Sequence, residues 1–161
     1  MLDLINALPD DRVVNQLTAA LRMLRPPEAN SVLEGMLAHE SRHVRLAGLK
    51  ISRRIVRTTN TFTHFLDIGL SRKDETEIRL WISSVGSAIG YKKLLKHFEV
   101  IANTRPELLV FAWYQLAPLV KNNASELSSA LNNLSQAIDF NLDKENMVLL
   151  EFWGRVKQAV S

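Results

Sequence analysis

Cysteine is absent from this chain of 161 residues, so disulfide bonds cannot hold the fold together. No uninterrupted apolar run approaches the roughly 20 residues that a membrane-spanning helix needs. The first residues, MLDLINALPDDR, lack the basic start and long apolar centre of a secretory signal. These absences favour a cytoplasmic protein that does not contact membranes.

Several catalytic signatures are also missing. The chain has no glycine-rich phosphate loop, and no serine lies in the strand-to-helix context of a nucleophile elbow. His64 and His97 have neither cysteine nor a paired acid at a ligand spacing. We therefore expect a protein without a cofactor and without an enzymatic centre.

What is present is a composition suited to folding. Hydrophobic residues make up 47% of the chain and charged residues 23%, as in ordinary globular proteins. A chain of this length buries about two thirds of its unfolded surface and is most simply one domain, residues 1–161.

The apolar pattern predicts helices. No stretch alternates apolar and polar residues as a half-buried strand does. Instead, an apolar anchor recurs with apolar or small residues three and seven positions later, and usually eleven, which marks one stripe along a helix. The five copies are Val14-Leu17-Leu21, Val44-Ala47-Ile51-Ile55, Ile78-Trp81-Val85-Ile89, Leu109-Ala112-Leu116-Val120 and Leu149-Phe152-Val156-Val160.

Shorter helical stretches lie between these five predicted helices, so each repeat has two helices. Helix-start signals agree with this division, since acids follow Pro9 and Pro106 lies in a predicted first turn. We therefore expect an all-α protein of about ten helices. The shorter stretches are Leu2 to Leu8, Glu28 to Ala38, Phe62 to Leu70, Tyr91 to Ala102 and Ser125 to Phe140.

The second and third repeats resemble HEAT repeats of the armadillo/HEAT type. Val44-Arg45 is followed by a small residue and a closing isoleucine, and Ile78-Arg79 begins a similar series. The resemblance implies a right-handed α-solenoid of about five helical hairpins. It also implies that the arginine after the anchor braces the preceding turn by binding an acid or a carbonyl group there. Gly48 and Gly86 are expected to allow close approach of the paired helix.

His39, Glu40 and His43 form the HExxH pattern of helix-borne zinc proteases. Three observations count against a metal site. The repeat pattern places these residues in a turn, Arg42 puts a positive charge inside the motif, and Leu49 stands where an extended motif has its third histidine. We interpret HExxH as a chance match, so no metal ligand is predicted.

Positive charge is concentrated in the middle of the chain. Residues 42–105 hold thirteen basic and five acidic side chains, whereas the segments on either side are net acidic. Second helices line the concave side of helical solenoids, so their outward residues are expected to form a binding surface that is basic at one end and aromatic in the middle. The predicted partner-binding residues are Arg42, Lys50, Arg53, Arg57, Tyr91, Phe111, Tyr114 and Gln115.

The sequence thus favours a non-catalytic binding or adaptor module that holds a protein partner through an acidic segment. The first alternative is nucleic-acid binding, with arginines on phosphates and Tyr91, Phe111 or Tyr114 as stacking platforms. The second is a zinc-dependent hydrolase that uses HExxH. The oligomeric state is not indicated by any pattern in the chain.

Overall fold

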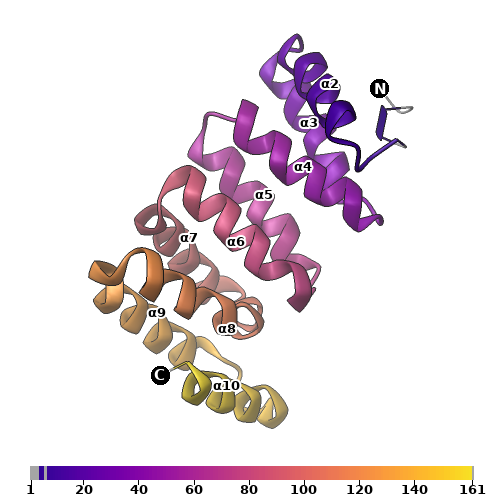
Figure 1. Ribbon diagram of the computed structural model, residues 1–161. Helices are drawn as coiled ribbons and strands as arrows, with labels where there is room; N and C mark the ends of the chain where they lie inside the picture. The colour runs from indigo at the N-terminus through magenta and orange to yellow at the C-terminus, as the bar shows by residue number, and fades with distance from the viewer. Residues whose placement is uncertain (1–3, 6, 161) are drawn as a thin grey trace. The chain divides into compact units, whose positions relative to one another are not determined.

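The computed structural model describes residues 4–5 and 7–160, and within these residues every regular element is helical. The prediction of an all-α protein is confirmed (Figure 1). The first expected helix, Leu2 to Leu8, includes residues outside this range, so ten helices are not confirmed. None of the described helices has the length and apolar character that crossing a bilayer requires.

Backbone contacts divide the chain into two compact units, residues 1–69 and 70–161, and each is described by itself. The first unit contains α2 (Asp11–Arg22), α3 (Pro26–Leu37), α4 (Arg42–Ile55) and most of α5 (Thr59–Ser71). The second contains α6 (Glu75–Ile89), α7 (Tyr91–Thr104), α8 (Pro106–Asn123), the 3-10 turn Ser125–Leu127, α9 (Ser128–Asn141) and α10 (Met147–Ala159).

Helix ends follow the local chemistry of the sequence. Asp10 caps α2, where its carboxylate accepts a hydrogen bond from the Arg12 backbone N–H at 2.7 Å. Pro106 occupies the first turn of α8, where no hydrogen-bond donor is needed. Gly90 alone separates α6 from α7 and has a φ of 88°, a conformation that favours glycine.

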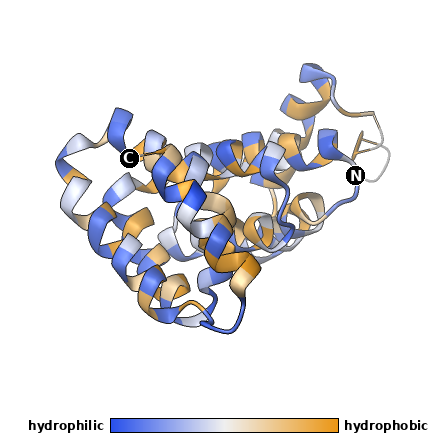
Figure 2. Cartoon of the chain, turned by 90° about the horizontal axis from the view of Figure 1, so that it is seen from below, coloured by the Kyte–Doolittle hydropathy of each residue, from blue (hydrophilic) through white to orange (hydrophobic). Residues whose placement is uncertain are grey.

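The apolar stripes of α2, α4, α6 and α8 form much of the core, as the repeat pattern predicts. Hydrophobic and hydrophilic residues alternate along the helices, as expected for helices that are buried on one face (Figure 2). In the first unit, Leu17 and Ile51 are fully buried, as are Leu33 of α3 and Leu66 of α5. Gly48 brings α4 close to α3, since a Cβ atom there would lie 3.1 Å from Leu37 Cδ2. The expected close approach at this glycine is confirmed.

The second unit buries aromatic side chains. Trp81, Trp113 and Trp153 are each at most 5% exposed, and the last two rings meet edge to face with centroids 5.3 Å apart. Helices α7, α8 and α9 all contact one another (Figure 1). The stripe predicted on α10 is only partly buried, because Val156 is buried while Leu149, Phe152 and Val160 are half-buried. Trp153, which lies beside this stripe, is the other buried side chain of α10.

Candidate functional site

The HExxH motif does not form a helical zinc site. Helix α4 begins at Arg42, so His39 and Glu40 lie in the turn that precedes it. The His39 Nδ1 atom accepts a hydrogen bond from the Ser41 backbone N–H at 3.0 Å. His39 and His43 therefore do not share a helical face. Within residues 4–5 and 7–160, no three metal-ligating side chains are grouped so that they could hold an ion.

Arg45 braces this turn. Its side chain is buried at 4% exposure, and its Nη1 atom donates to the carbonyl oxygens of His39 at 2.8 Å and Glu40 at 2.6 Å. A buried guanidinium needs such acceptors because burying a charge without hydrogen bonds is costly. The predicted contact between Arg45 and a carbonyl group of the preceding turn is confirmed.

Arg79 does not repeat this arrangement, and the corresponding prediction is wrong. Its side chain is exposed, and its guanidinium has no hydrogen bond to the part of the chain that the structure describes. The buried charged residue of α6 is instead Glu77, whose carboxylate accepts a hydrogen bond from Trp81 Nε1 at 3.4 Å. Of the two predicted bracing arginines, only Arg45 therefore contacts the preceding turn.

Four basic residues of the predicted site, Arg42, Lys50, Arg53 and Arg57, are exposed on α4 and just after it. We call them the α4 basic surface. Lys50 is not free, because its Nζ atom lies 2.6 Å from the Asp11 carboxylate of α2. This hydrogen bond, together with the charges of Lys50 and Arg54, lowers the pKa of Asp11 below its ordinary value. Asp11 is distant in sequence, so the pattern of α4 alone missed it.

Arg53 and Arg57 differ from Lys50. No acid or hydrogen-bond acceptor among residues 4–5 and 7–160 engages either guanidinium. Arginine presents donors in a planar fork that matches carboxylate and phosphate geometry. These two side chains are therefore available to bind an anionic partner.

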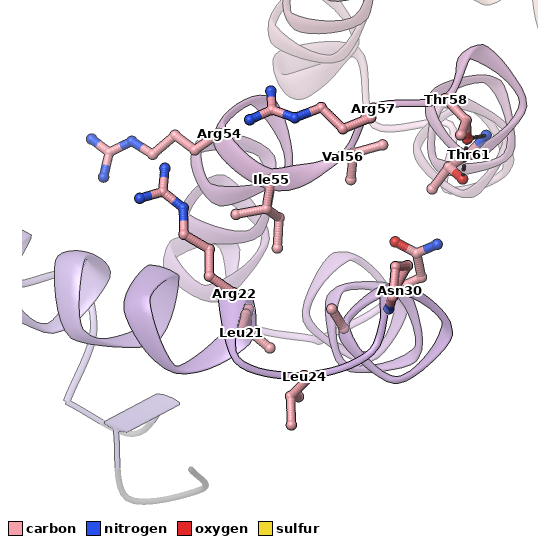
Figure 3. Close-up of a pocket in the computed structure, with 12 residues that line it drawn as sticks. Leu21, Arg22, Leu24, Asn30, Arg54, Ile55, Val56, Arg57, Thr58 and Thr61 are labelled. Carbon is pink, nitrogen blue, oxygen red and sulfur yellow. Dashed lines mark hydrogen bonds between the residues drawn. The ribbon is translucent and has the colours of Figure 1, made fainter.

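A pocket of about 380 Å³ lies beside Arg57 in the first unit. It is formed where the end of α2 and the start of α3 meet the end of α4 and the turn into α5. Figure 3 shows the guanidinium groups of Arg22, Arg54 and Arg57 gathered on one side of it. The lining residues are Leu21, Arg22, Leu24, Pro26, Ala29, Asn30, Arg54, Ile55, Val56, Arg57, Thr58 and Thr61.

Two arginines of this pocket, Arg22 and Arg54, were not predicted from the sequence. Arg54 is held in place, since its Nη1 atom donates to Asn15 Oδ1 at 2.8 Å. Arg22 has no such partner within the described ranges. Their positions in the sequence could have indicated them, because all three pocket arginines lie at or just beyond the end of a second helix. In a stack of hairpins these helix ends come together.

The aromatic members of the predicted site lie in the second unit and are mostly used internally. Phe111 packs on Phe152 with ring centroids 5.6 Å apart, and Lys73 Nζ lies 5.6 Å from its ring centre. Tyr91 lies so close to Gly86 that a Cβ atom there would be 2.8 Å from the Tyr91 ring. Tyr114, by contrast, is 55% exposed.

Gln115 is half-buried on α8, beside the exposed Tyr114 in sequence. Because the units are described separately, the continuous surface that joins the basic and aromatic residues stays a prediction. The α4 basic surface and its neighbouring pocket are the candidate site that one unit contains by itself.

No protein-family model, no curated protein and no solved structure matches this chain.

Proposed function

We propose that the protein is a non-catalytic binding module of HEAT-like helical hairpins whose α4 basic surface holds an acidic segment of a partner protein. The observation that carries this proposal is the pair of exposed arginines, Arg53 and Arg57, whose charges the described residues leave unmatched. Exposed like charges that no nearby acid neutralises raise the local concentration of an oppositely charged partner.

The HEAT-like part of the proposal is supported by the hairpin of α3 and α4. These helices contact each other across the turn of residues 38–41, and Arg45 donates to two carbonyl groups of that turn. The resemblance implies this use of the arginine. A braced turn fixes the start of α4 and so holds the outward side chains of the same helix on one rigid element.

An acidic protein segment fits the site better than a single-stranded nucleic acid. Non-specific binding of single strands combines a basic groove with aromatic side chains on which bases stack. Two of the three predicted stacking residues, Tyr91 and Phe111, pack against their own unit. The first unit has no tyrosine or tryptophan, and its two phenylalanines, Phe62 and Phe65, are buried.

A direct comparison of two anionic probes tests the proposal. A fluorescein-labelled peptide of six glutamates and a labelled oligothymidylate with six phosphates would be titrated with the protein at low ionic strength. We expect the peptide to bind more tightly, and Arg53→Ala to weaken its binding severalfold, because one matched charge is lost.

Arg12→Ala is the matched control, because Arg12 is also an exposed helical arginine of the first unit but does not belong to the α4 basic surface. Its peptide affinity should equal that of the wild type. Tighter binding of the oligothymidylate, with equal sensitivity to Arg53→Ala, would reject the protein-segment proposal in favour of nucleic acid.

A further inference from the structure

We infer that the pocket beside Arg57 receives an apolar side chain of the acidic segment, while Arg22 and Arg57 bind the carboxylates that flank it. This inference rests on the proposed function and adds a sequence requirement to it: the partner must carry an apolar residue between acids. Charge alone would be recognised by the α4 basic surface without any pocket.

The floor of the pocket is apolar. Leu21, Ala29 and Val56 form its buried part, while Leu24 and Ile55 are half-buried and remain accessible from it. Figure 3 shows Ile55 projecting between the arginine side and Asn30. Such a floor stabilises an apolar side chain through loss of water contact, but it offers nothing to a bare phosphate, which would lose hydration there.

The rim of the pocket is charged, in contrast to its apolar floor. Arg54 is anchored to Asn15 at 2.8 Å, which leaves Arg22 and Arg57 as the guanidinium groups without a partner in the described part of the chain. Arg25, which lies just before α3, is already engaged, because its side chain binds the Glu28 carboxylate and lowers the pKa of that group. The rim is thus positively charged at defined positions.

The far side of the pocket is polar but uncharged. Thr58 and Thr61 are joined through their hydroxyl groups at 2.7 Å, and the Thr58 hydroxyl also accepts from the Thr61 backbone N–H at 3.3 Å. Asn30 lies on the same side in Figure 3. Its carboxamide can both donate and accept, as the backbone of an extended peptide requires.

The size of the pocket limits what enters it. Its volume of about 380 Å³ is at the lower end of the range for ligand pockets. That space suits one apolar side chain with its nearest backbone atoms. A segment that places one branched apolar residue between acidic residues therefore matches the floor, the rim and the volume together.

Two labelled peptides test this inference on the wild-type protein: Gly-Glu-Glu-Leu-Glu-Glu-Gly, and the same peptide with alanine in place of leucine. Both carry the same charge, so the α4 basic surface alone would bind them equally. We expect the leucine peptide to bind about tenfold more tightly, as partial burial of a larger apolar side chain predicts. Equal affinities would overturn the inference.

Variants then place the effect in the pocket. Ile55→Asp should remove the advantage of leucine over alanine, and Arg22→Ala should weaken both peptides severalfold, whereas the control Arg12→Ala should change neither. Arg22→Ala keeps the test informative if thermal melts show that Ile55→Asp is unfolded. Loss of the leucine advantage in Arg12→Ala, or its persistence in a folded Ile55→Asp protein, would also contradict the assignment.

The outcomes separate the two proposals. If both peptides bind equally and Arg53→Ala weakens them, the pocket inference fails while the proposed function stands. If neither peptide binds and the oligothymidylate does, both fail.

Discussion

Each unit pairs some of its positive charges internally and leaves others without a hydrogen bond among the described residues, but the two units differ in which charges these are. In the second unit, Lys157 lies 2.6 Å from the Asp139 carboxylate and 5.2 Å from the centre of the Trp153 ring, and Lys73 lies over Phe111. In the first unit, Arg53 and Arg57 are exposed and make no hydrogen bond or ion pair with the residues that the structure describes. Lys157 and Lys73 therefore interact with groups of their own unit, whereas Arg53 and Arg57 remain available to another molecule.

The core composition follows the same division. All three tryptophans and both tyrosines lie in residues 70–161, while the first unit has only two phenylalanines. Aromatic rings with polar edges need donors and acceptors near the core, and charged residues supply them in the second unit. The core of the first unit, where Phe62 and Phe65 are the buried aromatic residues, contains no indole or phenol group that makes such a demand.

The largest effect on stability is expected at Arg45, a buried arginine that the first unit uses internally. Arg45→Ala leaves two carbonyl groups of the turn without their charged donor, and we expect the free energy of unfolding to fall by about 2–3 kcal/mol. Urea unfolding would measure the loss. Arg53→Ala, on the same helix but exposed, should change stability by less than about 0.5 kcal/mol. Equal losses in the two variants would show that Arg45 is not a brace.

In the second unit, the largest loss of stability is expected at Asp139. Its carboxylate accepts from Trp153 Nε1 at 2.6 Å and binds Lys157 at the same distance. Asp139→Ala leaves a buried indole N–H unpaired, at an expected cost of about 1–2 kcal/mol. Urea unfolding followed by tryptophan fluorescence measures it, with Glu151→Ala on the exposed side of α10 as control. An unchanged urea midpoint would mean that the contacts of Asp139 with Trp153 and Lys157 do not stabilise the second unit.

Alanine substitutions at two glycines of the first unit should change stability by smaller amounts that differ from each other. A Cβ atom at Gly48 would meet Leu37 at 3.1 Å, whereas nothing lies within 4 Å of one at Gly35. Gly35→Ala should therefore stabilise α3 by about 0.5–1 kcal/mol through helix propensity. Gly48→Ala should lose this gain to crowding and be less stable than Gly35→Ala in thermal melts. Equal stabilisation would show that α3 and α4 are not in close contact there.

The smallest effect is a pH dependence in the second unit. Burial raises the pKa of Tyr91, against opposing effects of a hydrogen bond with Ser83 and the charge of Arg79. A raised pKa in the folded state means that stability is present below the unfolded value near 10 and is lost as the pH rises through the folded value. Tyr91→Phe should remove this alkaline loss in pH-dependent unfolding. An identical alkaline slope in both proteins would exclude Tyr91 as its source.

The helices were predictable because the apolar stripe repeats every 3 to 4 residues and is interrupted by clear helix-start signals. The turn at His39 followed from the same repeat, and the role of Arg45 followed from the resemblance to HEAT repeats. The ion pair of Lys50 with Asp11 and the pocket arginines Arg22 and Arg54 were not predictable, because they depend on which helix ends come together. Arg79 shows the limit of the repeat pattern, since it follows a buried anchor, Ile78, as Arg45 follows Val44, but is itself exposed.

The central claim is that the outward arginines of the first unit bind an acidic partner and do not support the fold. The measurement that tests it most directly is the salt dependence of peptide affinity for the double variant Arg53→Glu, Arg57→Glu, beside the control Lys92→Glu, Lys96→Glu in the second unit. We predict an unchanged thermal melt, severalfold weaker binding of the glutamate peptide and a flatter dependence on salt for the arginine variant alone. Unfolding of that variant, or binding equal to that of the lysine control, would contradict the claim.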